Sequence, residues 1–407
     1  MKKLLILGAY YTEIEIIERA KALGCYTIVT DNHPNPLMSP AKQVADEAWD
    51  ISWTNIDDLC RKCAECQVDG VIAGFSEFRV ESMINICERL NLPCSLTMKQ
   101  LDITRDKNCF KRTCEKYGIP CVPEHQYNDS FDFPVIVKPV DRAGSVGISV
   151  VYNRENFETA YQYAMSMSNS KSVIVEDFIS DGTKVDVYYY VKNGGICLLG
   201  TSDTIMCHDS GVMQKAWPFP SKWERQYVEE IDGKVRNMIK GIGIENAYLT
   251  ISAFYTKDHF YIFETGFRLS GEMSFNYYKT LTGVDYVEEM IRFALGEKGD
   301  AQFVEHSGTA LNSIILNFFA KDGTIKKIYN IDAISAIPDV IDFLVYGQEG
   351  EEIHNSGSLL KKIAMCTICA TDWERIKDVV DQVNRLFSVM STDDKEMIYE
   401  KVERGEL

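Results

Sequence analysis

The stretch FDFPVIVKPVDRAGSVGISVV, residues 131–151, places a lysine and a glycine-rich loop between two β-branched runs. Residues 135–137 and 148–151 are typical of neighbouring buried strands. The connection between them begins at Lys138 and is longer than the two to five residues, roughly, of an ordinary hairpin. A loop of this composition can offer backbone N–H groups to an anion while the lysine adds positive charge. A surface hairpin whose lysine lies along apolar surface explains these residues equally well.

The length and charge of the chain limit its partners. With 407 residues it is long enough for two or three domains. Its net charge of −17 argues against nucleic acid or an anionic membrane as a partner, because both need a basic face. No run approaches the roughly 18 apolar residues of a membrane span. An anionic ligand would therefore be held by a few local lysines and arginines.

Thirteen cysteines raise the question of a disulfide framework or a metal site. The opening MKKLLIL is broken by Glu13 and is followed by no cleavage site, so we expect reduced thiols and a cytoplasmic location. Cys60, Cys63 and Cys66 could suggest a metal or iron–sulfur site. We favour ordinary helix cysteines, because the surrounding residues 54–70 have a helical pattern and no fourth ligand lies nearby.

Residues 1–100 alternate between strand and helix patterns, which predicts a parallel, Rossmann-like α/β sheet. We expect LPCS, residues 92–95, to add a further strand. The first turn, GAYYTE, lacks the glycine fingerprint of a dinucleotide site. Ligands of such sheets lie at the carboxyl ends of strands, here near Gly8, Asp31 and residues 74–77.

Beyond residue 101 the pattern becomes α+β. Residues 104–120 and 154–167 are predicted as helices, and residues 185–200 as a long hairpin around Asn193. A helix over residues 224–241 leads to two strands within residues 247–266. A third unit from about residue 301 carries further short strands and a helix over residues 373–387.

Five segments, in this order, resemble the ATP-grasp superfamily of carboxylate–amine ligases, which includes carbamoyl-phosphate synthase and L-amino acid ligases. They are residues 6–49, RDKNCFKRTCEKYGIPCVPE (105–124), VIVKPVDRAGSVGI (135–148), VIVEDFI (173–179) and ETGFRLSGE (264–272). The resemblance implies a pre-ATP-grasp domain over 1–100, an ATP-grasp domain over 101–300 with a lid at about 110–178, and a small C-terminal α+β domain over 301–407.

The resemblance also implies a nucleotide site. Lys107 and Lys138 would contact the phosphates, and Glu176 would accept the adenine amino group. The other residues it implies for ATP are the loop glycines and serine, two backbone positions at the adenine edge, and the position expected to bind ribose: Gly144, Ser145, Gly147, Phe178, Ile179 and Lys184. Neither Thr183 nor Lys184 is the acidic residue that the family places near the ribose.

Metal and substrate residues follow from the same resemblance. Glu264 would bind Mg²⁺, and Arg268 would stabilise the transferred phosphoryl group or bind the carboxylate of the acyl substrate. Lys215, with a catalytic role, and Glu77 are further candidates at the substrate site. Ser252 and Gly266 stand where the family usually has metal ligands, so Glu272 or Asp203 would have to help.

The implied activity is an ATP-dependent ligase. ATP would convert a small carboxylate to an acyl phosphate, and an amine would then displace the phosphate. The implied cofactors are ATP and Mg²⁺, and the partners are small molecules, with a homodimer possible because many relatives are dimers. Two alternatives stay open: a non-catalytic nucleotide-binding subunit, which Ser252 and Gly266 favour, and bicarbonate phosphorylation as in carbamoyl-phosphate synthase.

Overall fold

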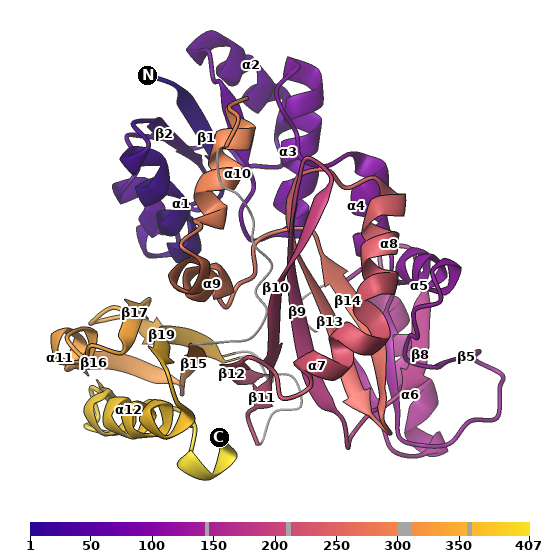
Figure 1. Ribbon diagram of the computed structural model, residues 1–407. Helices are drawn as coiled ribbons and strands as arrows, with labels where there is room; N and C mark the ends of the chain where they lie inside the picture. The colour runs from indigo at the N-terminus through magenta and orange to yellow at the C-terminus, as the bar shows by residue number, and fades with distance from the viewer. Residues whose placement is uncertain (143–145, 209–212, 300–310, 356–359) are drawn as a thin grey trace.

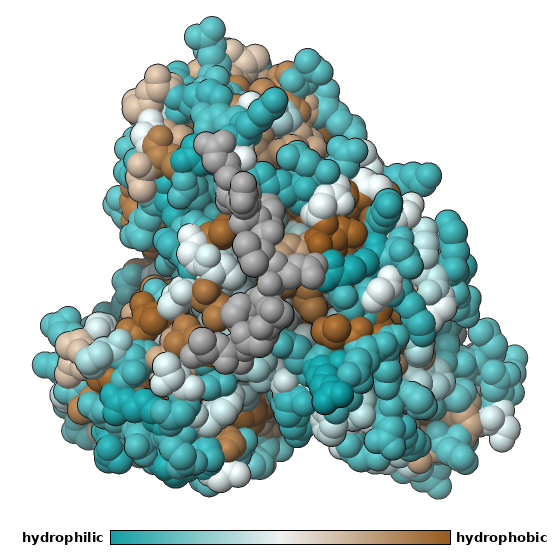
Figure 2. Space-filling model, in the orientation of Figure 1, coloured by the Kyte–Doolittle hydropathy of each residue, from teal (hydrophilic) through white to brown (hydrophobic). Residues whose placement is uncertain are grey.

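The computed structural model describes residues 1–142, 146–208, 213–299, 311–355 and 360–407. The chain forms three lobes, with the N-terminal lobe and the C-terminal lobe on one side of the middle lobe (Figure 1). The surfaces of all three are mostly hydrophilic in the face shown (Figure 2). No helix within the described residues is both long enough and apolar enough to cross a membrane.

The N-terminal lobe is the predicted Rossmann-like sheet. Its strands are all parallel, in the order β3-β2-β1-β4. Their bounds are β1 Lys3–Leu7, β2 Tyr26–Thr30, β3 Glu47–Trp49 and β4 Gly70–Ile72, and the helices are α1 Tyr11–Ala22, α2 Ile56–Cys66 and α3 Glu77–Leu90.

The expected strand at residues 92–95 is wrong. Residues 92–95 form no strand. The additional strand of this four-stranded sheet is β3, which precedes α2 in the chain. Asn91 ends α3 in the left-handed conformation, and Leu92 N–H donates to Cys87 O. Pro93 then has no N–H to donate to a sheet. This segment therefore leads directly into the next helix.

The three clustered cysteines lie on α2, as predicted. The Asn55 side chain accepts a hydrogen bond from Asp58 N–H and caps the helix. Cys63 is buried in the core of the lobe, where burial raises the pKa of its thiol to about 12. No metal-type cluster of His, Cys, Asp and Glu in the described chain includes these thiols.

The middle lobe contains two antiparallel sheets. The larger one has the order β10-β9-β13-β14 and is covered on one face by α7, η3 and α8, and the smaller one has the order β5-β8-β6-β7 and packs against α6 (Figure 1). The bounds are β5 Glu124–His125, β6 Val135–Pro139, β7 Ser149–Val151, α6 Arg154–Met167, β8 Val173–Asp177, β9 Thr183–Lys192, β10 Gly195–Asp203, α7 Glu224–Tyr227, η3 Val228–Asp232, α8 Gly233–Ile242, β13 Ala247–Thr256 and β14 His259–Gly266.

Residues 104–120, expected as one helix, contain a break. Helix α4, Met98–Arg105, ends at Asp106, and α5, Lys107–Lys116, begins directly after it. Asp106 has extended backbone angles, and its side chain accepts a hydrogen bond from Cys109 N–H at 2.9 Å. Asp106 is thus the N-cap of the second helix, which places Lys107 at its first position.

The C-terminal lobe holds a sheet with the order β11-β12-β15-β19-β17 and a smaller one, β18-β16-β20. Their bounds are β11 Ile205–Met206, β12 Gln214–Phe219, β15 Asn312–Ala320, β16 Gly323–Tyr329, α11 Ile331–Ser335, β17 Val340–Val345, β18 Glu352–Ile353, β19 Lys361–Ala370, α12 Trp373–Leu386, β20 Ser388–Ser391 and η4 Arg404–Glu406. Because β12 pairs with β15, this sheet includes strands from both sides of residue 300.

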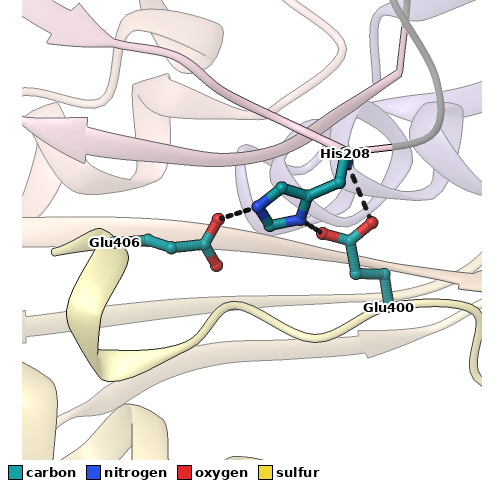
Figure 3. A group of neighbouring side chains, drawn as sticks. All are labelled: His208, Glu400 and Glu406. Carbon is teal, nitrogen blue, oxygen red and sulfur yellow. Dashed lines mark hydrogen bonds and ion pairs between the residues drawn. The ribbon is translucent and has the colours of Figure 1, made fainter.

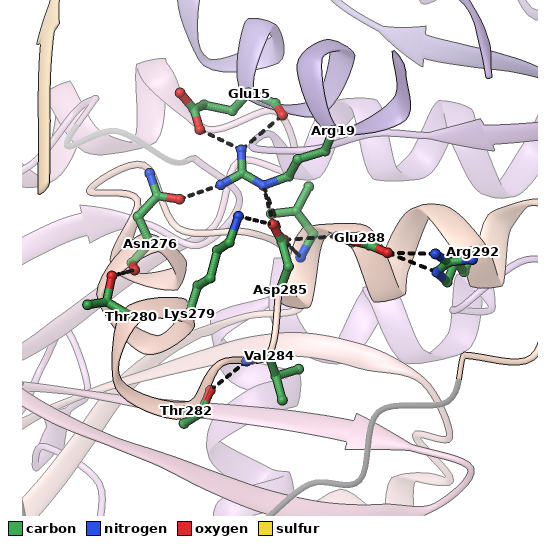
Figure 4. Close-up of polar contacts among 11 residues, drawn as sticks. Glu15, Arg19, Asn276, Lys279, Thr280, Thr282, Val284, Asp285, Glu288 and Arg292 are labelled. Carbon is green, nitrogen blue, oxygen red and sulfur yellow. Dashed lines mark hydrogen bonds and ion pairs between the residues drawn. The ribbon is translucent and has the colours of Figure 1, made fainter. Parts of the chain in front are cut away.

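Ion pairs and hydrogen bonds join α1 of the N-terminal lobe to the helices that follow β14. The Arg19 guanidinium on α1 lies 2.8 Å from Asp285 and donates to Asn276 at 2.5 Å (Figure 4). Lys279 reaches Asp285 as well, at 2.8 Å. These partners belong to α9, Ser274–Thr282, and to the N-cap of α10, Tyr286–Ala294. The network therefore fixes the N-terminal sheet relative to the chain that follows β14.

Candidate functional site

A cavity of about 1540 Å³ lies between the lobes. The residues that line it lie at the start of α3, on α5, on strands β6 and β8, and on one face of β9, β13 and β14. It is larger than the roughly 300–1000 Å³ of most small-molecule sites, so it has room for a nucleotide and a second substrate. The predicted residues that line it are Glu77, Lys107, Lys138, Glu176, Phe178, Ile179, Lys184, Glu264 and Arg268.

Lys138 and Glu176 form a buried ion pair in the lid. Lys138 lies on β6 and Glu176 on the adjacent strand β8, and they are 6% and 2% exposed. Lys111 reaches the second carboxylate oxygen of Glu176 at 2.5 Å. Burial would raise the pKa of Glu176, but Lys138 and Lys111 outweigh it and hold the pKa below its ordinary value. Glu176 therefore stays ionised and orients Lys138, and its role with adenine remains a prediction.

Lys107 connects α5 to the start of the glycine-rich loop. Its ammonium donates to Arg142 O at 2.8 Å and to Val140 O at 3.4 Å. Burial lowers the pKa of Lys107; Glu264 opposes this shift and Lys138 adds to it. Carbonyl oxygens leave the lysine charge uncompensated, which favours an anion beside it.

The glycine-rich loop is described only in part. Gly144 and Ser145 lie outside the described residues. Gly147 has a φ of +77°, and a Cβ there would come within 2.7 Å of Pro139 Cγ. Position 147 therefore requires glycine, because its backbone is in the left-handed region and because a side chain there would clash with Pro139.

One of the two residues predicted at the adenine edge already uses its backbone N–H in a hydrogen bond within the protein. Phe178 follows β8, and its backbone N–H donates to Pro134 O at 3.2 Å. This N–H is thus taken up by the lid itself. Contacts of Phe178 and Ile179 with a purine remain a prediction, which their place in the cavity lining supports.

The predicted metal position lies in a row across three strands. Glu264 on β14 is paired with Ser252 on β13, and Ser252 is paired with Asp186 on β9. Directly opposite residues project to the same face of a sheet, and all three line the cavity. Glu264 is exposed to it, whereas Asp186 is 4% exposed. Lys184, two residues before Asp186, lies 2.7 Å from its carboxylate.

Glu77 and Arg268 meet beside this row. A Cβ on Gly266 would lie 3.5 Å from Glu77 Oε1 and 3.8 Å from Arg268 Cζ. Burial raises the pKa of Glu77 to about 6, with Arg268 opposing and Glu264 adding to the shift. Arg268 Nε is buried and has no hydrogen-bond partner among the described residues. The start of α3 and the end of β14 thus form one charged corner of the cavity.

Lys215 does not itself line the cavity, although its partners His208 and Glu406 do. It is fully buried on β12 and forms ion pairs with Glu400 and, at 2.7 Å, with Glu406 near the C-terminus. His208 contacts the same carboxylates, Glu400 at 2.6 Å (Figure 3). His208, Glu400 and Glu406 are spaced as metal ligands could be, but the Lys215 ammonium already pairs with both carboxylates. In this structure Lys215 holds the C-terminal segment, and a catalytic role for it stays a prediction.

The sequence analysis missed three residues of the site. Lys111 stands four residues after Lys107 on α5, a spacing that places both on one helix face. Asp186 follows Lys184 by two residues in a strand, so both project to one face. Lys362 on β19 lines the cavity although it is nearly 100 residues from the other site residues. Only Lys362 lacked a local signal in the sequence.

Comparison with known proteins agrees with this geometry. Residues 106–301 match the family described as carbamoyl-phosphate synthase L chain, ATP binding domain. A formate-dependent phosphoribosylglycinamide formyltransferase from Trichormus variabilis is 28% identical over 277 residues, which cover 63% of this chain and 67% of that one. Residues 106–301 include the cavity strands β6, β8, β9, β13 and β14. The matched segment, just under half of the chain, is similar to the ATP-binding domains of the ATP-grasp superfamily.

Two solved structures share the ATP-grasp fold over almost the whole chain. An L-amino acid ligase from Bacillus licheniformis aligns with a TM-score of 0.81 at 18% identity, covering 96% of this chain and 99% of its own. The second is the biotin carboxylase domain of Hydrogenobacter thermophilus 2-oxoglutarate carboxylase, a dimer in complex with MgADP, ADP and bicarbonate. It aligns with a TM-score of 0.78 at 20% identity, covering 97% of this chain and 91% of its own. The predictions of an ATP-grasp fold and of an ATP-dependent ligase class are confirmed.

Proposed function

We propose that this ATP-grasp protein uses Mg·ATP to activate a small carboxylate as an acyl phosphate and joins it to an amine, releasing ADP and phosphate. The observation that carries the proposal is the set of charged side chains that separate elements bring to one cavity. Lys107 on α5 and Lys138 on β6 line it together with Glu77, Glu264 and Arg268, and Lys107 lies close enough to Lys138, Glu264 and Glu77 for each of them to affect its pKa. Phosphates bound at the two lysines would therefore lie beside the Glu264 carboxylate.

The residues present fit one divalent ion. Glu264 offers an exposed carboxylate that faces the cavity, and oxygen ligands are those that Mg²⁺ prefers. When bound, the ion would neutralise charge on the triphosphate. No side-chain nucleophile is needed for acyl transfer through a phosphate; positioning and charge stabilisation are sufficient.

An anionic substrate is favoured at the corner that contains Arg268. Lys362 enters the same cavity from the C-terminal sheet, donates to Gly271 O at 3.2 Å and lies over the Tyr346 ring at 5.6 Å. No carboxylate pairs with Lys362 or Arg268 in the described parts of the chain. Glu77 lies near Arg268 and Glu272 lies near Lys362, but neither carboxylate forms a direct ion pair with its neighbouring cation among the described residues. The two cations would bind the carboxylate of the acyl substrate, and Glu272 would bind a cationic amine.

The test is release of phosphate from Mg·ATP in the presence of pooled amino acids and small carboxylates, with hydroxylamine added to trap an acyl phosphate as a hydroxamate. The test variant is Lys138→Met combined with Glu176→Gln, which removes both halves of the buried pair. Lys99→Met, at an exposed position on α4, is the matched control. We expect release and trapping in the wild type and the control, and neither in the double variant.

A non-catalytic nucleotide-binding subunit is the second candidate, because Ser252 and Gly266 supply no carboxylate beside Glu264. Such a protein would bind an ATP analogue with micromolar affinity. Its release of phosphate from ATP would stay at background with every pool of amino acids or carboxylates. Product from one pool, identified by mass spectrometry, would instead establish the ligase. Size-exclusion chromatography with light scattering tests the predicted homodimer.

A further inference from the structure

The row formed by Asp186, Ser252 and Glu264 has carboxylates at its ends and a hydroxyl in the middle. Ser252 is paired with both other residues through the strand register. Gly266, two residues beyond Glu264, adds no side chain. Glu264 is therefore the one carboxylate of the described row that is both exposed to the cavity and without an ion-pair partner.

Both oxygens of the Asp186 carboxylate already accept hydrogen bonds from the protein. Its Oδ1 accepts a hydrogen bond from Ser252 Oγ at 2.5 Å. Its Oδ2 accepts from Lys184 Nζ at 2.7 Å and from Thr204 Oγ1 at 3.1 Å. To bind a metal ion, Asp186 would have to break an ion pair and a short hydrogen bond while it is 4% exposed. Loss of such buried contacts is costly.

The ammonium of Lys184 therefore occupies the place beside the row where a second cation would bind. It lines the cavity, and Asp186 and Thr204 fix its position, with Thr204 Oγ1 at 3.5 Å. An ammonium is a compact point charge that binds phosphate oxygens. Ser252 completes the arrangement, because its hydroxyl orients Asp186 and brings no charge of its own.

We propose that the nucleotide site takes a single divalent ion, at Glu264, and that the Lys184 ammonium, held by Asp186, supplies the second positive charge to the triphosphate. This inference rests on the proposed nucleotide binding, and it specifies how the triphosphate charge is divided between an ion and a side chain. Asp186 and Ser252 act as positioning residues, and Lys184 contacts the nucleotide.

The experiment counts ions rather than turnover. The full chain is titrated with Mn²⁺ in the presence of a non-hydrolysable ATP analogue, and bound Mn²⁺ is measured by electron paramagnetic resonance. Analogue binding is measured separately by calorimetry. The variants are Lys184→Met, Lys184→Arg and the pair Lys184→Met with Asp186→Asn, each checked for folding by circular dichroism.

We expect the wild type and Lys184→Arg to bind one Mn²⁺ per analogue. Lys184→Met should gain a second Mn²⁺, because Asp186 is then free to bind it, and the added Asp186→Asn change should remove that second ion. In the absence of added metal, Lys184→Met should weaken analogue binding roughly tenfold relative to Lys184→Arg, as loss of one charged contact predicts.

Two Mn²⁺ per analogue in the wild type would overturn the inference while leaving the proposed function intact. Analogue affinity that is equal in Lys184→Met and Lys184→Arg would overturn it as well. If the calorimetry shows no analogue binding to the folded wild type, the proposed function fails together with the inference.

Discussion

The Glu77 carboxylate on α3 lies 3.5 Å from the point where a side chain on Gly266 of β14 would begin. Residues almost 190 positions apart thus share one corner of the cavity. Glu77 fills the space that a larger residue at position 266 would use, beside Glu264 and Arg268. An acidic residue at the cavity end of the N-terminal lobe is therefore part of the cavity wall.

The first prediction concerns the ionisation of Glu77. Its pKa is raised to about 6, so folding favours the protonated form, and this stabilisation is present at low pH and lost as pH rises through about 6. Glu77→Gln should therefore stabilise the protein by about 1–2 kcal/mol at pH 8 and by little at pH 4.5. Urea unfolding at both values measures this difference. An equal effect of the substitution at the two pH values would contradict the prediction.

Substitutions at Lys138 and Glu176 should affect the stability of the protein and its binding of ATP differently. Lys138→Met leaves Glu176 buried with Lys111 alone, and we expect a loss of up to roughly 3–5 kcal/mol, as for a broken buried pair. The added Glu176→Gln change should restore most of the stability. It should not restore ATP binding, because the phosphate-facing cation is still missing. Thermal unfolding and calorimetry report the two effects; recovery of binding in the double variant would show that Lys138 has only a structural role.

Lys362 should determine the affinity for the acyl substrate. Burial lowers its pKa to about 8, with Glu272 opposing the shift, so the ammonium is lost as pH rises through about 8. KM for the carboxylate should rise above that pH, while KM for ATP stays constant. In Lys362→Arg this rise should disappear, since arginine remains charged. Lys362→Met should raise the same KM roughly tenfold at pH 7; a change in KM for ATP instead would place Lys362 at the nucleotide.

Substitutions at Lys215 distinguish a structural role of this residue from a catalytic one. As the counter-ion of Glu400 and Glu406, it stabilises the C-terminal segment, and Lys215→Met should lower Tm by several degrees. Adding Glu400→Gln and Glu406→Gln should restore both Tm and turnover, because no unpaired charge remains. A triple variant with a restored Tm but background turnover would establish the catalytic role that the sequence predicts.

The sequence by itself determined the strands and helices that carry the proposed nucleotide site. The hairpin at residues 135–151, the strand that contains Glu176 and the strand pair around residues 247–266 all form as their local patterns predict. Alternating apolar residues, capping side chains and turn glycines act over a few positions, so a single segment contains the information needed to predict them. The ATP-grasp family followed from the order of five such segments.

Only the tertiary structure decided which charges meet. Glu176 binds Lys138 and Lys111, Lys215 turns toward the C-terminal segment, and Lys362 enters the cavity from a different sheet. An ion pair depends on the distance between side chains on separate elements, and that distance is set when sheets and helices pack. Whether a lysine faces a phosphate, a neighbouring carboxylate or the end of its own chain therefore cannot be predicted from the residues around it.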